Sequence, residues 1–157
     1  MRKLQQLLSL PQIKTALVIS ALILGTLFLN KTYSDETKIR INNHIFSVEL
    51  AISTTERSRG LMHRGSLAAN TGMLFIYSEP QTVSFWMKET LIPLDLLFFD
   101  KDGQLIELHH NIQPCKVSAC KTYTNKKPAQ FALEFAAGTA KKMGIKEGSN
   151  FTIVITE

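Results

Sequence analysis

The stretch Ser84–Asp100, SFWMKETLIPLDLLFFD, decides the fold because it places a few polar residues inside an otherwise apolar strand sequence. Successive side chains of an extended chain point to opposite faces, so we expect Phe85 and Met87 to enter a core while Trp86 and Lys88 face away from them. Two interpretations of the outward pair stay open. Either Trp86 covers the sheet with the Lys88 stem packed against it, or ring and ammonium form part of a binding surface.

Asp95 is the second unusual polar residue of this stretch, since apolar residues flank it on both sides. A buried carboxylate requires hydrogen bonds or an ion pair to offset the loss of water. Asp95 is therefore expected either to accept backbone amides or pair with an arginine, holding the turn at residues 91–93, or to lie at the rim of a pocket.

Short apolar or alternating runs continue on both sides of this stretch, separated by turn residues. They predict strands at residues 39–41, 46–51, 73–77, 83–87, 94–99, 105–109, 130–135 and 151–156. Asn42-Asn43 predicts a hairpin, and the Asp-Gly chemistry of Asp100–Gly103 predicts another reversal. Many short strands with turn signals favour a mainly β domain, either a single sandwich or a small barrel.

Two short helices complete the expected domain. The first begins near Ser53 or Thr54, where a hydroxyl caps free amides, and ends near Gly60. Within it, Glu56 and Arg59 are three residues apart and are expected to form a surface pair. The second helix is expected at residues 139–143, followed by a glycine suited to a left-handed cap.

Three blocks of sequence, taken in order, resemble a known family. The first is ERSRGLMHR at 56–64 with GMLF at 72–75, and the second is FWMKETLIPLD at 85–95. The third is Tyr123 followed by ALE at 132–134, with Gly138 and Gly144-Ile145 after it. These blocks resemble the domain of unknown function 192 family over roughly residues 41–156. The resemblance implies a largely β fold and no established activity.

The N-terminal part contains an uncharged apolar run at residues 15–29, preceded by Arg2, Lys3 and Lys14. Its length lies between the apolar region of a signal peptide and a full membrane span. The lack of an A-x-A-like cleavage site favours a signal anchor over a removed signal peptide in residues 1–30. The preceding positive charges orient the N-terminus toward the cytoplasm. We therefore expect a polar tether at 31–38 and one membrane-anchored or secreted domain at 39–157, in the periplasm or at the cell exterior.

The net charge of +5 is inflated by that segment, which holds three of the 18 basic residues. The remaining basic residues nearly balance the 13 acidic residues. Nucleic-acid binders concentrate basic charge on a patch or stripe. No nucleic-acid partner is therefore expected, and the predicted partner is the membrane, through the N-terminal segment.

Cys115 and Cys120 both lie in the part expected outside the cytoplasm, where an oxidising environment permits a disulfide. Closing so short a loop stabilises the fold by about 2 kcal/mol, so the bond is a local clip. A redox or metal role is the alternative, although neither C-x-x-C spacing nor repeated Cys/His ligand pairs occur.

Arg57 and Arg64 are candidate binding residues because a guanidinium fork suits bidentate recognition of a carboxylate or phosphate. We expect them to contact Asp95, Glu134 or a ligand. The alternative is that they form ordinary ion pairs that fix the fold.

No metal or cofactor is expected. His109 and His110 are adjacent on a predicted strand and therefore point to opposite faces, which disfavours one shared ion. Met62, Met73 and Met87 could join a histidine in a copper site, but methionines more often fill gaps in a core.

The sequence lacks a nucleophile elbow, a phosphate-binding glycine loop and a zinc-protease histidine pair. The leading hypothesis is therefore a membrane-anchored extracytoplasmic β-rich module that binds a small polar or anionic ligand, such as an envelope saccharide. The candidate ligand-binding residues are Arg57, Arg64, Trp86, Lys88, Asp95 and Glu134. One alternative is a hydrolase or lyase of envelope polymers using Asp95 with Glu134 or Glu56. The other is a structural partner of an envelope protein.

Overall fold

The computed structural model describes residues 37–155. The predicted signal anchor or signal peptide and most of the polar tether lie outside these residues. Between residues 37 and 155, neither helix has the length and apolar character needed to cross a membrane.

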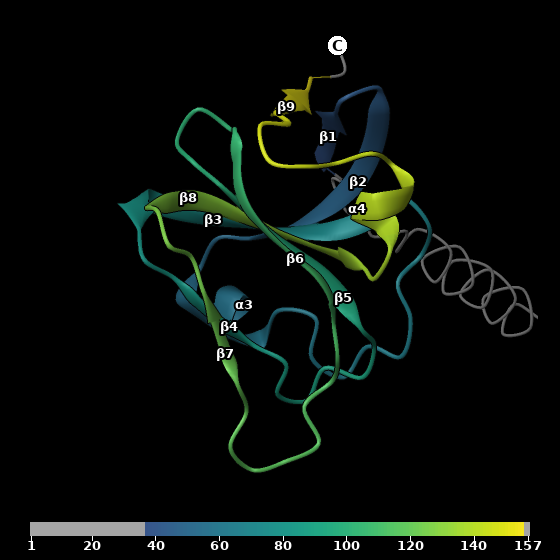
Figure 1. Cartoon of the computed structure of the whole chain (residues 1–157), viewed down its shortest axis with the longest axis vertical. Coiled ribbons are helices and arrows are strands. Elements are labelled where there is room, and N and C mark those ends of the chain that lie inside the picture. The colour runs from purple at the N-terminus through teal and green to yellow at the C-terminus, as the bar shows by residue number, and fades with distance from the viewer. Residues whose placement is uncertain (1–36, 156–157) are drawn as a thin grey trace, which may run out of the picture. The chain divides into compact units, whose positions relative to one another are not determined.

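Nine β-strands and two short helices make up the described region (Figure 1). The strands are β1 (Thr37–Ile41), β2 (His44–Ala51), β3 (Thr71–Gln81), β4 (Ser84–Trp86), β5 (Leu94–Phe99), β6 (Leu105–Ile112), β7 (Thr122–Thr124), β8 (Ala129–Ala136) and β9 (Phe151–Val154). The helices are α3 (Thr54–Arg59) and α4 (Thr139–Lys142). The prediction of a mainly β domain with two short helices is confirmed.

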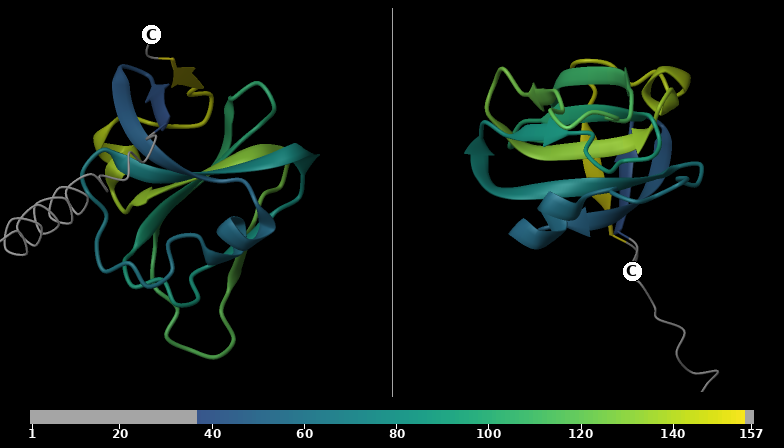
Figure 2. Two further views of the ribbon diagram at one scale, coloured as in Figure 1. Left: turned by 180° about the vertical axis from the view of Figure 1, so that it is seen from behind. Right: turned by 90° about the horizontal axis from the view of Figure 1, so that it is seen from below.

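Seven strands form one curled sheet in the order β6-β5-β8-β3-β2-β1-β9, and the curl is visible in Figure 2. Neighbouring strands are antiparallel except β2 and β3, which run parallel and are connected through α3. Near the two edge strands, the N–H of Phe151 donates to the carbonyl of Gly103 at 3.0 Å. The architecture is thus a half-barrel, with β4 and β7 as a separate ribbon, rather than a two-sheet sandwich.

Alternation along the central strands divides the apolar side chains into two clusters, one on each face of the sheet. On β8, Leu133 and Phe135 belong to one cluster and Ala132 to the other. The first cluster is closed by residues of β1, β9 and α4, including Ala140. The second is covered by residues after α3 and by the β4–β7 ribbon, including Phe85. Because the sheet has a packed surface on each side, an inward polar side chain on either face is buried.

The predicted reversals occur where glycine or asparagine adopts a positive φ. Asn42 has φ +53° in the turn between β1 and β2, and Gly103 has φ +78° between β5 and β6. The Asp100 carboxylate accepts the N–H groups of Asp102 and Gln104, each at 2.9 Å. This hydrogen bonding explains why the Asp-Gly sequence reverses the chain there.

Strand β1 begins at Thr37, two residues before the strand predicted from Ile39. Lys38 pairs with Ser47 on β2 and with Val154 on β9, so it belongs to the sheet rather than to a tether. The edge of the sheet therefore extends into the segment assigned from sequence to the tether.

Helix α3 starts with a reciprocal capping box. The N–H of Glu56 donates to the Ser53 hydroxyl at 3.2 Å, and the N–H of Ser53 donates to the Glu56 carboxylate at 2.7 Å. The predicted start is confirmed. The expected pair of Glu56 with Arg59 is wrong, because the carboxylate turns back to the amides of Ser53 and Ile52.

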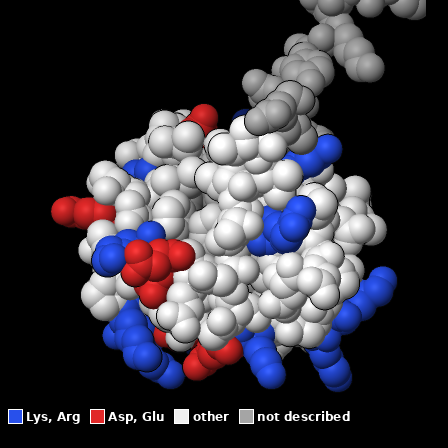
Figure 3. All heavy atoms as spheres, turned by 90° about the horizontal axis from the view of Figure 1, so that it is seen from above, with Lys and Arg blue, Asp and Glu red and all other residues white. Residues whose placement is uncertain are grey.

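The surface outside the clusters is of mixed charge. On the face drawn in Figure 3, basic and acidic side chains lie mostly toward the edge, with a basic side chain nearer the middle of a largely uncharged area. This face has the composition of an ordinary solvated surface.

Candidate functional site

A cleft of about 330 Å³ lies where α3 and the turn after it approach β3 and β4. We call it the α3–β4 cleft. Polar side chains on its walls come from Thr54, Arg57, Ser58, Arg59, Tyr77, Ser84 and Thr90, and aromatic ones from Phe75, Phe85 and Trp86. Two arginines and no carboxylate are found among the lining residues of this described cleft. The cleft therefore combines positive charge with flat apolar surface.

Trp86 lines the β4 side of the cleft, and Lys88 lies two residues farther along the chain. Phe85 and Met87 are buried, with 9% and 4% of their surface exposed, whereas Trp86 is 48% exposed, which confirms the predicted alternation. The Lys88 ammonium lies 5.3 Å from the centroid of the Trp86 ring, a cation–π contact worth about 0.5–1 kcal/mol at an exposed position. The ring therefore keeps an open face and a neighbouring positive charge.

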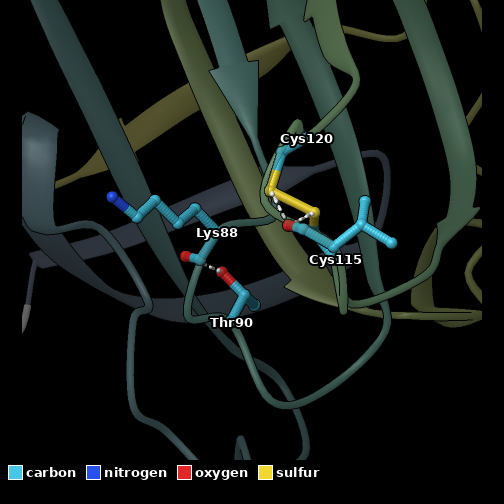
Figure 4. The surroundings of a disulfide bond; sticks show 5 residues. Lys88, Thr90, Cys115 and Cys120 are labelled. Atoms are coloured by element: carbon cyan, nitrogen blue, oxygen red, sulfur yellow. Dashed lines mark hydrogen bonds between the residues drawn. A yellow bond between two sulfur atoms is a disulfide. The ribbon is translucent and has the colours of Figure 1, made fainter.

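Residues on both sides of the disulfide loop are hydrogen-bonded to β4 and to Met87, which follows it. Trp86 pairs with Thr122 on β7, and the N–H of Cys115 donates to the Met87 carbonyl at 3.2 Å. The predicted disulfide joins Cys115 to Cys120, with 5.7 Å between their Cα atoms. Figure 4 shows it beside the segment from Lys88, whose side chain extends away from it. The segment that carries Trp86 is hydrogen-bonded to β7 and to Cys115. The disulfide thus joins Cys115 to Cys120, which lies just before β7.

Arg57 joins α3 to β3. Its Nη1 atom donates to the carbonyls of Ile52 and, at 3.1 Å, of Ile76, and the guanidinium lies 4.9 Å from the Tyr77 ring centroid. Its Nη2 and Nε atoms make no hydrogen bond within residues 37–155. Burial raises the pKa of Tyr77 to about 12, so the phenol stays neutral beside this charge. Arg57 is thus structural through one nitrogen and still offers donors to the cleft.

Arg59 also lines the cleft and was not among the residues selected from sequence. It forms no ion pair within the described part of the chain, because its expected partner Glu56 is used by the capping box. The pattern Ser53-x-x-Glu56 was the signal that could have identified Arg59 as unpaired. Tyr77 was missed as well, since its position opposite α3 depends on the parallel crossover.

Glu134 lies behind the wall of the cleft. It is opposite Met73 on β3 and Leu96 on β5, only 5% exposed, and burial raises its pKa to about 8. Glu134 has no hydrogen bond or ion pair within residues 37–155. Its oxygens are nevertheless not among the wholly buried side-chain atoms that lack a partner in that range, where His109 Nε2 is such an atom. The Glu134 oxygens therefore keep a small contact with solvent.

Gly60 lies between Glu134 and the cleft. A Cβ placed on Gly60 would be 3.8 Å from Glu134 Oε2 and 3.3 Å from the Phe75 ring, and Gly60 itself lines the cleft. The position has φ +47°, which favours glycine. Gly60 therefore borders the cleft and also lies close to the Glu134 carboxyl.

Asp95 lies on the other face of the sheet. Its carboxylate accepts the N–H groups of Asn111 and Ala140, each at 2.9 Å, which corresponds to the expectation that it accepts backbone amides. It borders a separate hollow of about 730 Å³, beside the partly exposed His110. Because Leu96, its neighbour on β5, is opposite Glu134, the Asp95 and Glu134 side chains point to opposite faces. These two carboxylates do not face one cleft.

Arg64 is paired with Glu49. Both guanidinium Nη atoms donate to the carboxylate, with 2.6 Å between Nη2 and Oε2. This hydrogen bonding holds the pKa of Glu49 below its usual range. The pair lies along a third hollow of about 240 Å³. Of the six residues predicted, Arg57 and Trp86 line the α3–β4 cleft, Lys88 lies beside the Trp86 ring and Glu134 lies near Gly60, whereas Arg64 and Asp95 lie elsewhere.

The two adjacent histidines are separated by the sheet. His109 Nε2 is 3.0 Å from Glu107 Oε1, whereas His110 faces the Asp95 side at 3.9 Å. Within residues 37–155, no group of three or more His, Cys, Asp or Glu side chains is placed to hold a metal ion.

Comparison with known proteins gives a family and a fold. The family model DUF192, described as "Uncharacterized ACR", matches residues 37–153. A crystal structure of a proposed transcription regulator from Sinorhizobium meliloti 1021 is 34% identical, with a TM-score of 0.70 over 75% of this chain and 93% of that one. A protein of unknown function from Novosphingobium aromaticivorans DSM 12444 is 30% identical, with a TM-score of 0.68 over 73% and 83% of the two chains. No protein of curated function matches.

Proposed function

We propose that this chain, which belongs to the domain of unknown function 192 family, binds a small anionic ligand in the α3–β4 cleft. The ligand class that suits the cleft best is an acidic saccharide unit. The protein acts as a binding module of the cell envelope, with its N-terminal segment as membrane anchor.

The extracytoplasmic location is supported by two features. Residues 15–29 are apolar and follow basic residues, as in a signal anchor. The Cys115–Cys120 disulfide suits an oxidising compartment.

The observation that carries the binding proposal is the pairing of an exposed aromatic ring with unpaired positive charge in one hollow. Trp86 is half exposed, and a flat indole is a platform on which a sugar ring can stack. Arg59 and the free nitrogens of Arg57 offer donors to an anion. A lining without a carboxylate does not repel such a ligand.

The size of the cleft limits the ligand. Small-molecule sites typically occupy about 300–1,000 Å³, and this cleft of about 330 Å³ is at the lower end. It therefore suits a monosaccharide-sized compound or one residue of a longer polymer.

Trp86 provides a direct test because it is the sole tryptophan in the chain. The full-length protein in detergent is titrated with glucuronate, galacturonate and glucose 6-phosphate, with glucose as the neutral control. We expect saturable changes of tryptophan fluorescence with an anionic sugar and much weaker ones with glucose. If none of the anionic sugars gives a saturable change, the proposal is wrong.

Matched arginine variants show where binding occurs. Arg59→Gln removes a charge from the cleft without a described structural contact, so we expect roughly tenfold weaker binding, the scale of one charge-assisted hydrogen bond. Arg64→Gln removes the same charge from the Glu49 pair outside the cleft. It should leave affinity unchanged, and equal losses in both variants would instead indicate nonspecific charge attraction.

A further inference from the structure

We infer that Arg57 is the specificity-determining residue of the α3–β4 cleft and binds two oxygens of the ligand's acidic group at once, through its Nε and Nη2 atoms. This inference rests on the proposed function and names the residue that selects the acidic group. The matching groups are a carboxylate and a phosphate, the two anions that an arginine fork holds bidentately.

The hydrogen bonds of Arg57 occupy one side of its guanidinium. Nη1 donates to the carbonyl of Ile52, just after β2, and to the carbonyl of Ile76 on β3 at 3.1 Å. In the planar guanidinium Nη1 lies on the side of Cδ, so Nε and Nη2 carry the two N–H groups of the opposite edge. The chain therefore holds Arg57 through one nitrogen and leaves a complete two-donor edge without a described partner.

This edge is accessible to solvent. Nε and Nη2 make no hydrogen bond within residues 37–155, and Arg57 is half-buried. If either atom were wholly buried, it would be an unpaired buried donor, but in the described part of the chain His109 Nε2 is the one such atom. Both nitrogens therefore keep contact with solvent. Arg57 lines the α3–β4 cleft, so we place the free edge at that cleft.

Tyr77 restrains the guanidinium without using one of its hydrogen-bond donors. The guanidinium carbon lies over the Tyr77 ring, 4.9 Å from its centroid, and Tyr77 also lines the cleft. Burial raises the pKa of Tyr77 to about 12, so the phenol stays neutral and does not cancel the charge of Arg57. Because the protein already orders this side chain, ligand binding costs less side-chain entropy.

The other two arginines of residues 57–64 lack this combination. Arg64 uses both Nη atoms in its pair with Glu49, outside the cleft. Arg59 lines the cleft, but it is exposed and no described hydrogen bond orients its guanidinium. Arg59 thus attracts an anion as a mobile charge, whereas Arg57 offers two donors in a fixed direction.

Nuclear magnetic resonance of the full-length protein in detergent tests the contact directly. The Nε–H signal of Arg57 is assigned by through-bond correlation from its backbone. Saturating glucuronate should move this signal to lower field and slow its exchange with water, because the proton enters a charge-assisted hydrogen bond. Neutral glucose should not move it, and the Nε–H signal of Arg64 should stay unchanged with either sugar. Glucose 6-phosphate in the same experiment shows whether a phosphate uses the same edge.

Arg57→Lys separates the fork from the charge. Lysine keeps the positive charge but offers a single point of contact, so glucuronate affinity by Trp86 fluorescence should fall about tenfold. Arg59→Lys is the matched control, the same change at an arginine of the same cleft that is not held in place. Its affinity should stay within about threefold of the wild-type value. Thermal melts establish that both variants are folded, and the wild-type spectra decide the question if Arg57→Lys is not.

The outcomes separate this inference from the proposed function. Glucuronate binding that leaves the Arg57 Nε–H signal in place would overturn the role of Arg57 and leave the cleft as a general anion site. Equal affinities of Arg57→Lys and Arg59→Lys would overturn it as well. Failure of every anionic sugar to change Trp86 fluorescence would overturn the proposed function itself.

Discussion

The Asp95 carboxylate accepts a hydrogen bond from the backbone N–H of Ala140 at 2.9 Å, across 45 positions of sequence. Its other oxygen accepts the N–H of Asn111. One side chain on β5 therefore binds both the start of α4 and the end of strand β6. This arrangement makes Asp95 a scaffold residue on the face of the sheet opposite the α3–β4 cleft.

Asp95→Asn should destabilise the protein by about 2 kcal/mol, because an amide has one acceptor oxygen and leaves one of two amides unpaired. Urea unfolding measures the change. Asp102→Asn is the matched control, since Asp102 is exposed and, within residues 37–155, its carboxylate pairs only with Lys101. Its effect should stay within about 0.5 kcal/mol, and equal effects at both positions would contradict the scaffold role.

Gly72→Ala should cost about 3 kcal/mol, because a Cβ at this position would lie 2.7 Å from both the Glu134 carbonyl oxygen and the Phe135 ring. The backbone of a central strand cannot move away from this contact. Gly65→Ala makes the same chemical change where nothing lies within 4 Å, and it should be nearly neutral. Unfolding curves for the two variants should differ clearly, and similar midpoints would exclude the predicted clash.

Glu134 should make stability depend on pH. Burial raises its pKa from 4.5 to about 8, so between these values the folded protein holds a proton that the unfolded chain has released. Stability therefore falls as pH rises through this window, by about 1.4 kcal/mol per unit at the steepest. Glu134→Gln should lack this component. Urea midpoints at pH 5, 6, 7 and 8 test it, and parallel profiles for both proteins would refute it.

Removal of the disulfide should loosen the cleft wall more than it destabilises the fold. A Cys115→Ser, Cys120→Ser protein loses a short-loop constraint worth about 2 kcal/mol. The larger effect should be on the quenching of Trp86 fluorescence by acrylamide, which should increase. Both contacts that hold the Trp86 segment, the pairing with Thr122 and the Cys115–Met87 hydrogen bond, lie beside the disulfide loop. Unchanged quenching in the folded double variant would show that β7 alone holds Trp86.

Local sequence patterns were sufficient for most of the strands and for the turns at Asn42 and Gly103. Alternation placed Phe85 inside and Trp86 outside, and Asn42 and Gly103 mark reversals because their conformations are encoded within a few residues. Strand β7 was missed, since it is three residues long and its pairing with β4 spans a long loop. The parallel crossover from β2 to β3 likewise depends on contacts that no local pattern encodes.

The sequence predicted some of the residues that line the candidate site, but not which of them lie together in the structure. Arg57 and Trp86 line one cleft because α3 and β4 both border it, whereas Arg64 pairs with Glu49, a partner that the sequence did not suggest. Glu134 was selected as a possible acid, yet its relation to Gly60 spans many residues and two elements. The register of strand pairing and the face of the sheet to which a side chain points decide which polar residues share one site. Charge and apolar pattern along the sequence do not determine this grouping.

The first and last strands of the described domain are neighbours, with Lys38 opposite Val154. The chain therefore enters and leaves the sheet at one place, distant from the β4–β7 ribbon (Figures 1 and 2). A domain whose ends meet is suited to circular permutation or to insertion as a unit into a loop of another protein. New termini opened beside the exposed Val117 would leave every strand pairing intact.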